Sequence, residues 1–393
     1  MGQGHPLEVF LAFLRQGVTA FGGPIAHLGY FRAEFVDRRK WLSEAAYADL
    51  VAMCQFLPGP ASSQVGMAIG LMRAGYAGML AAWLAFTLPS ALVMALFAYG
   101  IGTWGNALDQ GWLHGLKIAA VAVVALAVLS MARALAPDRM RASLAVAAAA
   151  IAIAIPNAWG QIAAIVLGGL FGLALLRDIS AGTQEDLPAI GSKTVAVGAL
   201  VLFFFFLIVL PLLAAATQNP ALVLADIFYR AGSLVFGGGH VVLPLLEADI
   251  VQTGLLDRDS FLAGYGAAQA VPGPLFTFSS YLGAAMGLFG NPWLGALLTT
   301  LAIFLPSMLL IVGTLPFWDA LRRYPSAQSA LAGVNAAVVG LLLAALYDPV
   351  WTAGIRNGTD FAIAAIAFVL LMLWRVPPWL VVALCAVAGA FVA

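Results

Sequence analysis

The sequence repeats a set of short motifs in the same order in both halves of the chain. Phe-Gly-Gly at 21–23 returns at 236–238, Gln-x-x-Pro-Gly-Pro at 55–60 returns at 269–274, and Leu-Pro-Ser at 88–90 returns at 305–307. The offset between paired motifs is almost constant, so the halves align with only small gaps. Repeated halves with apolar segments broken by glycine and proline are typical of membrane transport proteins.

The composition places the chain in a lipid bilayer. Hydrophobic residues make up 63% of the 393 residues and charged residues only 9%, against roughly 25% charged in soluble proteins. Apolar runs of about 20 residues fit spanning helices, and the alternation expected of a β-barrel is missing. Lys+Arg and Asp+Glu both number 18, so the net charge gives no reason to expect a nucleic-acid partner.

The apolar segments divide the chain into two repeats and a connection. We expect a first repeat at 1–177, a polar linker with one linking transmembrane helix at 178–221, and a second repeat at 222–393. A single unpaired span between the repeats turns the second repeat upside down. The sequence therefore predicts an all-α integral membrane protein with two inverted repeats of broken, re-entrant and spanning helices, joined by one linking transmembrane helix.

The basic loops favour one topology. If all thirteen apolar segments crossed, the basic loops 32–40 and 133–141 would lie on opposite sides of the membrane, against the positive-inside rule. If the Phe-Gly-Gly and Pro-Gly-Pro segments enter and return, both loops lie inside. We therefore prefer about nine full spans with four re-entrant segments, and keep thirteen crossings as the alternative. Residues 1–8 show no signal-peptide pattern.

The glycine and proline motifs are the candidate substrate-binding elements. Glycine permits positive φ and close backbone approach, and proline frees a carbonyl group from its hydrogen bond. A helix that restarts after such a break presents unpaired N–H groups, which bind anions. The alternative is that the motifs are packing kinks. The candidates are Gly22, Gly23, Pro58, Gly59, Pro60, Gly237, Gly238, Pro272, Gly273 and Pro274.

Polar side chains near these breaks are further candidates. Arg15 and Arg230 lie at matching places inside apolar segments, where an arginine is costly and suits an oxyanion, unless it snorkels to the interface. Gln55 and Gln269 precede the Pro-Gly-Pro breaks and can donate to a substrate or bridge helices. Ser62 follows the first break and can either line a site or cap a helix.

Three ionisable residues are candidates for proton coupling. His27 and His240 follow the Phe-Gly-Gly turns, and Glu247 lies near the end of the second one. A hydrogen-bonded structural role is the alternative for the histidines, and a side chain that simply faces solvent is the alternative for Glu247. We find no metal-ligand cluster, catalytic motif or cofactor motif, so we expect neither an enzyme nor a cofactor.

Together these motifs resemble the chromate ion transporter family in its long, two-domain form, over nearly the whole chain. The resemblance implies halves of opposite orientation and export of chromate across the bacterial inner membrane, with chromate resistance as the result and sulfate as a competing analogue. It carries a functional role to Arg15, Phe21, Gly22, Gly23, Gln55, Pro58, Gly59 and Pro60. The chain departs from its own pattern once, with Gly239 where the first half has Pro24.

The expected function is export of chromate, a tetrahedral oxyanion, across the inner (plasma) membrane by alternating access. The alternatives are a carrier of sulfate or another oxyanion and an anion channel. The expected partners are the oxyanion and the lipid bilayer, and the sequence also allows a homodimer.

Overall fold

The structure is a computed structural model of the chain, and it describes residues 4–104, 111–176, 192–287, 290–321 and 324–392. Within these ranges every regular element is helical, which confirms the predicted all-α class. The polar part of the expected linker, at 177–191, and the basic pair at 322–323 lie outside the described residues. Six of the described helices are long and apolar enough to cross a membrane, and two further apolar helices are shorter.

The first half begins with two interrupted segments and continues with longer helices. Its elements are α1 (Pro6–Thr19), α2 (Gly23–Phe31), the π-helical turn η1 (Arg32–Arg38), α3 (Glu44–Phe56), α4 (Ala61–Trp104), α5 (Gly111–Leu135), α6 (Arg139–Ala154) and α7 (Ala158–Leu175). The linking helix α8 (Lys193–Thr217) follows.

The second half repeats this order. Its elements are α9 (Pro220–Leu234), η2 (Gly239–Val241), α10 (Val242–Ile250), α11 (Arg258–Ala268), η3 (Leu275–Thr277), α12 (Phe278–Ala285), α13 (Pro292–Thr314), η4 (Leu315–Phe317), α14 (Trp318–Leu321), α15 (Pro325–Ala345), η5 (Leu346–Trp351), α16 (Thr352–Gly354), α17 (Gly358–Met372) and α18 (Pro378–Val392). The short polar residues between the apolar runs set many of the helix starts. Asp138, Asn157 and Asp257, for example, each accept a hydrogen bond from a backbone N–H in the first turn of the helix that follows.

The first Phe-Gly-Gly segment is a re-entrant hairpin. Phe13 of α1 stacks on Phe35 of η1 with ring centroids 4.7 Å apart, so the chain runs back along the helix by which it entered. At the open end of the hairpin, Glu8 lies 3.9 Å from Arg39. The segment therefore enters and leaves on one side, as the preferred topology requires.

The first Pro-Gly-Pro segment returns to that same side. Trp41 precedes α3, and the guanidinium of Arg73 in α4 lies 4.9 Å from the centre of its ring. Arg73 also pairs with Glu8 at 3.1 Å. The chain then turns at Ala74 and Gly75, where the φ of Gly75 is +65°. The 44-residue helix α4 is thus a short returning arm followed by one full span. We call the end of the molecule that holds Glu8, Arg39 and Arg73 the basic end.

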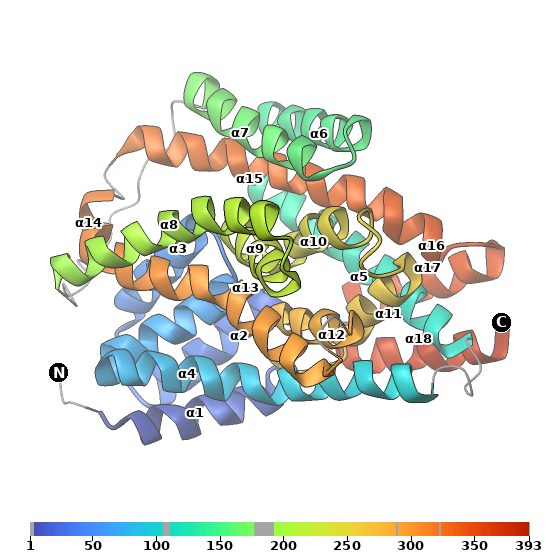
Figure 1. Cartoon of the computed structure of the whole chain (residues 1–393), viewed down its shortest axis with the longest axis horizontal. Coiled ribbons are helices and arrows are strands. Elements are labelled where there is room, and N and C mark those ends of the chain that lie inside the picture. The colour runs from blue at the N-terminus through green and yellow to red at the C-terminus, as the bar shows by residue number, and fades with distance from the viewer. Residues whose placement is uncertain (1–3, 105–110, 177–191, 288–289, 322–323, 393) are drawn as a thin grey trace.

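The corresponding segments of the second half are hairpins as well. Arg230 of α9 pairs with Asp249 of α10 at 3.3 Å. The hydroxyl of Tyr281 in α12 donates to the carbonyl oxygen of Ser260 in α11 at 2.8 Å. Figure 1 shows the start of α1 and the end of α18 at opposite ends of the long axis. We call the end formed by the starts of α11 and α17 the distal end.

The halves are interlaced rather than separate. Gly172 of α7 packs closely on Gly333 of α15, and Gly389 of α18 packs in the same way on Gly115 of α5. Small residues at such contacts let helix backbones approach each other in a membrane. Each half therefore lays its last helices on the other half, and α15 passes beneath α6 and α7 in Figure 1.

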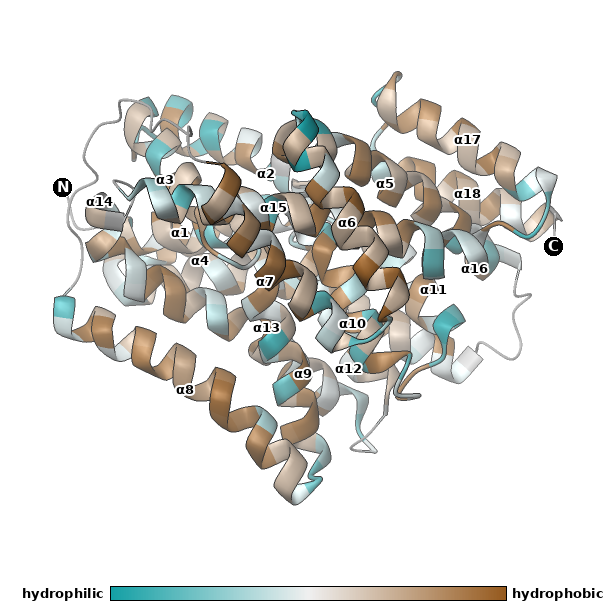
Figure 2. Cartoon of the chain, turned by 90° about the horizontal axis from the view of Figure 1, so that it is seen from above, coloured by the Kyte–Doolittle hydropathy of each residue, from teal (hydrophilic) through white to brown (hydrophobic). Residues whose placement is uncertain are grey.

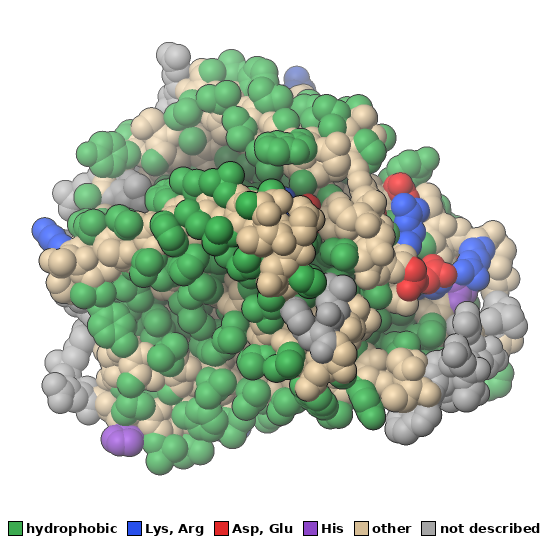
Figure 3. All heavy atoms as spheres, in the orientation of Figure 1, with side chains coloured by type: hydrophobic (Ala, Val, Ile, Leu, Met, Phe, Trp, Pro, Cys, Tyr) green, Lys and Arg blue, Asp and Glu red, His purple; other side chains and the backbone are tan. Residues whose placement is uncertain are grey.

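The outer surface matches a lipid environment. Figure 2 shows α8 at the edge of the bundle and hydrophobic along most of its length, and Leu202, Phe204 and Ile208 of this helix are exposed. In Figure 3 hydrophobic side chains dominate the visible face, and charged side chains gather at the edge over the ends of α11, α16 and α17. The chain is an integral membrane protein with inverted repeats.

Candidate functional site

The Phe-Gly-Gly turns break the first helix of each half. Gly22 and Gly23 have φ values of +101° and +75°, and Gly237 has +74°. These values lie in the left-handed region that favours glycine, so α1 and α9 end where the motif begins. Neither α2 nor η2, which restart after the turns, has a side-chain cap on its first N–H groups.

The Pro-Gly-Pro breaks bind across the two halves in a reciprocal way. The N–H of Gly59 donates to the carbonyl oxygen of Val235 at 2.6 Å, and the N–H of Gly273 donates to that of Ala20 at 3.0 Å. Each acceptor is the residue directly before Phe-Gly-Gly in the opposite half. We call these two interactions the cross-half bonds. They join each Pro-Gly-Pro break to the Phe-Gly-Gly turn of the other half, and the contact between Gly239 and Pro24 brings the two joined pairs together.

The Leu-Pro-Ser motifs complete these contacts. A Cβ atom added at Gly59 would collide with Ser307. A Cβ atom added at Gly273 would lie 2.8 Å from Ser90 Oγ. Both glycines have strongly positive φ, +124° and +99°. The third repeated motif thus packs each serine on the Pro-Gly-Pro glycine of the other half.

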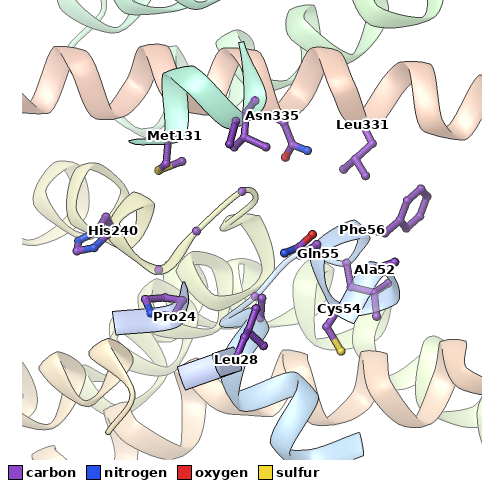
Figure 4. A pocket seen from close by; sticks show the side chains of 18 of the residues that line it. Pro24, Leu28, Ala52, Cys54, Gln55, Phe56, Met131, His240, Leu331 and Asn335 are labelled. Atoms are coloured by element: carbon purple, nitrogen blue, oxygen red, sulfur yellow. The ribbon is translucent and has the colours of Figure 1, made fainter. Parts of the chain in front are cut away.

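A cavity of about 730 Å³ lies beside the first cross-half bond. Its lining comes from both halves and includes Gly22, Pro24, Gln55, Gly59, Ala61, Ser130, Gly237, Gly238, Gly239, His240, Gln328 and Asn335. Figure 4 shows Gln55 and Phe56 on one wall, facing Asn335 and Leu331 of α15 on the other. The residue Trp318 of α14 also lines it, and its indole N–H donates to the Asp49 carboxylate at 3.2 Å.

The hydrogen-bond donors that the cavity wall presents to an anion are neutral. None of the described residues that line it is Lys, Arg, Asp or Glu. Three helical segments, α2, α4 and the run from η2 into α10, begin at its wall with Gly22, Ala61 and Gly239 among the lining residues. Helix N-termini carry partial positive charge and free N–H groups.

Two polar side chains in the cavity wall are notable. Asn335 Oδ1 is buried and has no hydrogen-bond partner, and an amide with an unsatisfied atom is free to rearrange around a ligand. His240 shares a 2.8 Å hydrogen bond between its Nδ1 and the hydroxyl of Tyr265. This bond fixes the ring and leaves its other nitrogen as the group that can face the cavity.

The structure brings some of the expected site residues into the cavity wall. Gly22, Gln55, Gly59, Gly237, Gly238 and His240 line it. Gly23, Pro58 and Pro60 belong to the same breaks but are not among the lining residues. Gln269, Pro272, Gly273 and Pro274 belong to the second Pro-Gly-Pro break, outside the cavity, and Gln269 Nε2 is buried without a partner.

Other expected residues lie elsewhere. Arg15 is exposed on α1, and Arg230 pairs with Asp226 at 3.0 Å and with Asp249. His27 is buried between Ser62 Oγ at 3.3 Å and the carbonyl oxygen of Ala20 at 3.1 Å, which fits a structural histidine. Glu247 is buried beside Gln252 in a separate cavity of about 110 Å³.

Sequence reasoning missed the walls that α5 and α15 contribute. Ser130, Gln328 and Asn335 line the cavity but belong to no repeated motif. The signal that could have revealed Asn335 is its position as a lone amide in an apolar run, because polar residues within spanning helices usually face protein or a cavity.

The inverted repeats and the cavity between broken helices define a membrane transporter. The model of the chromate transporter family matches residues 7–173 and again 222–390. The chain belongs to the chromate transporter family. No solved structure matches the chain significantly.

Curated relatives agree with this assignment. The chain is 30% identical over 351 residues to the chromate transport protein of Pseudomonas aeruginosa, covering 87% of this chain and 80% of that protein. It is 26% identical over 402 residues to the probable chromate transport protein of Synechococcus elongatus, covering 96% and 93%. It is 25% identical over 349 residues to the chromate transport protein of Cupriavidus metallidurans, covering 86% and 81%.

The position of Arg15 leads to a test by substitution. Because its side chain is exposed and the cavity lies elsewhere, we expect Arg15→Gln to transport at close to the parent rate. Transport by reconstituted vesicles, normalised to folded protein, measures this. A well-folded Arg15→Gln protein without transport would return Arg15 to the substrate path, as the sequence alone suggests.

Proposed function

We propose that the chain carries chromate, or a closely related tetrahedral oxyanion such as sulfate, across the membrane by alternating access. The observation that carries this proposal is the cavity where broken helices of both halves meet, with three helix starts and no acidic side chain in its described wall. A dianion needs compensating hydrogen bonds when it leaves water. Helix starts supply them without the tight binding of a fixed ion pair.

The proposed topology has nine crossings and places the basic end in the cytoplasm. The four hairpins enter and return, which leaves α5, α6, α7, α8, α13, α15, α17, α18 and the second arm of α4 to cross. Arg38, Arg39 and Arg73 then lie inside, in agreement with the positive-inside rule. We propose the inner membrane as the location and the boundaries 1–177, 178–221 and 222–393 as the repeats and their linker.

The membrane potential favours export over uptake. One charge that crosses 100 mV changes its free energy by about 2.3 kcal/mol. The free energy of a dianion falls by roughly 4.6 kcal/mol when it leaves a negative interior. This decrease supports an outward concentration ratio of about three powers of ten. Export therefore needs no coupling ion. Among the three candidates for proton coupling, His240 alone lines the cavity, so a dependence of the flux on a proton gradient would be assigned to His240 and would add to the effect of the potential.

Transport by the purified protein tests the proposal. We expect saturable chromate movement in reconstituted vesicles, accelerated by an interior-negative potential in the outward direction and competed by sulfate. Molybdate serves as a larger tetrahedral oxyanion in the same assay. Empty vesicles and vesicles with an unrelated membrane protein are the controls. Stronger competition by sulfate than by chromate would make a sulfate carrier the better assignment, and non-saturable flux would indicate a channel.

A further inference from the structure

The cavity lies between two helices whose counterparts in the inverted arrangement are packed together. The cavity separates α3 from α15, and Ala52 of α3 lines it. The alignment that pairs Gln55 with Gln269 also pairs Ala52 with Gly266 in α11. A Cβ at Gly266 would collide with the backbone of Leu116 in α5. Thus α11 and α5 are in direct contact where α3 and α15 stand apart.

Glycine contacts fix the correspondence between α5 and α15. Gly115 packs against Cys385 and Gly389 of α18, and Gly333 packs against Gly168 and Gly172 of α7. Cys385 follows Gly168, and Gly389 follows Gly172, by the same number of residues. Gly333 follows Gly115 by a number that is only one residue larger. The two sets of contacts are therefore counterparts, and they pair Gly115 of α5 with Gly333 of α15.

The same pairing relates Lys117 to Asn335, because each lies two positions after its glycine. The cavity residue whose Oδ1 has no hydrogen-bond partner therefore has a lysine as its counterpart.

Lys117 is buried in the closed interface near the distal end. Its side chain is 5% exposed, and Nζ lies 2.9 Å from Oδ1 of Asp259, the second residue of α11. Asp259 is 61% exposed, and Arg356 approaches its other oxygen at 3.9 Å. On the same stretch of α5, His114 Nε2 lies 3.1 Å from the Asp360 carboxylate of α17.

We propose that Lys117 contacts the oxyanion in the state of the protein that is open to the distal end. Inverted repeats generate their second state when the halves exchange conformations. In that state α11 withdraws from α5, in the way that α3 stands away from α15 in the present structure. Lys117 then lines the substrate route, as Asn335 lines the cavity in the present structure. This inference rests on the proposed function and adds a charged contact that the present cavity does not have.

The ion pair with Asp259 gives this step a physical basis. The Lys117 ammonium is buried while the Asp259 carboxylate is exposed, so withdrawal of Asp259 takes the nearest counter-charge away from a lysine held among apolar helices, which is unfavourable. When α11 leaves, an oxyanion is the group that can replace the Asp259 carboxylate beside Lys117. Opening toward the distal end is therefore favoured by the substrate, and Asp259 displaces the substrate when the interface closes.

Transport measured from the distal side tests the inference. We expect Lys117→Asn, which copies the counterpart residue, to raise the chromate KM on the distal side by about tenfold or more, because a charge-assisted hydrogen bond is lost. Lys117→Arg keeps the charge and should stay close to the parent. Arg356→Gln is the matched control, since it removes the other cation beside Asp259 and should change this KM less than about twofold.

Asp259→Asn separates substrate contact from a merely structural role. It breaks the same ion pair as Lys117→Asn, so equal increases in KM for the two variants would overturn the inference. An unchanged distal KM in Lys117→Asn would overturn it as well. If the parent protein carries no chromate at all, the proposed function fails instead.

An accessibility measurement does not depend on a folded Lys117 variant. The pairing of Gly115 with Gly333 also pairs Leu113 with Leu331, and Leu331 lines the cavity. In a chain with Cys54→Ala and Cys385→Ala, we expect Leu113→Cys to react faster with an impermeant maleimide from the distal side during chromate turnover than without chromate. Equal labelling rates would show that the α5–α11 interface does not open, and would overturn the proposal.

Discussion

Gly59→Ala is expected to abolish transport and to lower the melting temperature of the protein substantially. The φ of Gly59 is +124°, a conformation that costs a residue with a side chain on the order of 1–3 kcal/mol. The new methyl group would also collide with Ser307 and lie 2.7 Å from Gln64 Nε2, which is itself held by the Pro58 carbonyl oxygen at 2.7 Å. Overpacking of this kind adds roughly 1–3 kcal/mol.

The substitution also acts on the geometry of the site. Any shift that relieves the collision moves the Gly59 N–H away from Val235, and this cross-half bond lies beside the cavity. Thermal unfolding in detergent and chromate flux in vesicles measure the two effects. Adding Ser307→Gly should restore part of the stability, because it removes one of the colliding side chains.

Gly75→Ala is the matched control for backbone strain alone. Gly75 also has positive φ, +65°, but a Cβ at this position meets nothing within 4 Å. We expect a small loss of stability and retained transport. Equal behaviour of Gly59→Ala and Gly75→Ala would mean that contact between the halves contributes little at the first Pro-Gly-Pro break.

Asn335→Asp is expected to stop transport while the protein stays folded. The change alters a few atoms in the cavity wall, and it places a carboxylate opposite Gln55 where the dianion would bind. At an effective dielectric constant of 20 and a separation of about 5 Å, each unit of like charge costs roughly 3 kcal/mol. Repulsion of a dianion is therefore sufficient to reduce flux by at least about a hundredfold.

Asn335→Ser separates charge from hydrogen bonding. It keeps a neutral polar group at the same place, so we expect a moderate rise in KM and continued transport. Heat stability with and without chromate reports binding directly, since a ligand stabilises the state that it binds. Chromate that still protects the Asn335→Asp protein against heat would place the anion away from α15.

The broken helices could be predicted from the sequence because their cause is local. Glycine and proline restrict or permit backbone conformations whatever surrounds them, so Phe-Gly-Gly and Pro-Gly-Pro marked the breaks. The repetition of these motifs predicted the two inverted halves. The basic loops favoured re-entrant segments, which the contacts within the hairpins confirm. The resemblance on the same motifs pointed to the family whose model matches both repeats.

The side-chain positions could not be predicted in the same way, because they depend on which face of a helix meets which neighbour. Arg15 and Arg230 occupy matching sequence positions, yet one is exposed and the other pairs with Asp226 and Asp249. Asn335 enters the cavity because α15 of the second half crosses over the first-half breaks. No spacing within a single repeat carries that information.

The cross-half bonds have a consequence for how such a chain could have arisen. The donor at Gly59 is satisfied by Val235, and the donor at Gly273 by Ala20, so neither repeat can satisfy its own Pro-Gly-Pro glycine in this arrangement. A precursor with a single repeat would have met the same need by pairing two copies of one polypeptide inserted in opposite directions. In the present chain the linking helix α8 lies between the repeats, so both orientations occur in one molecule.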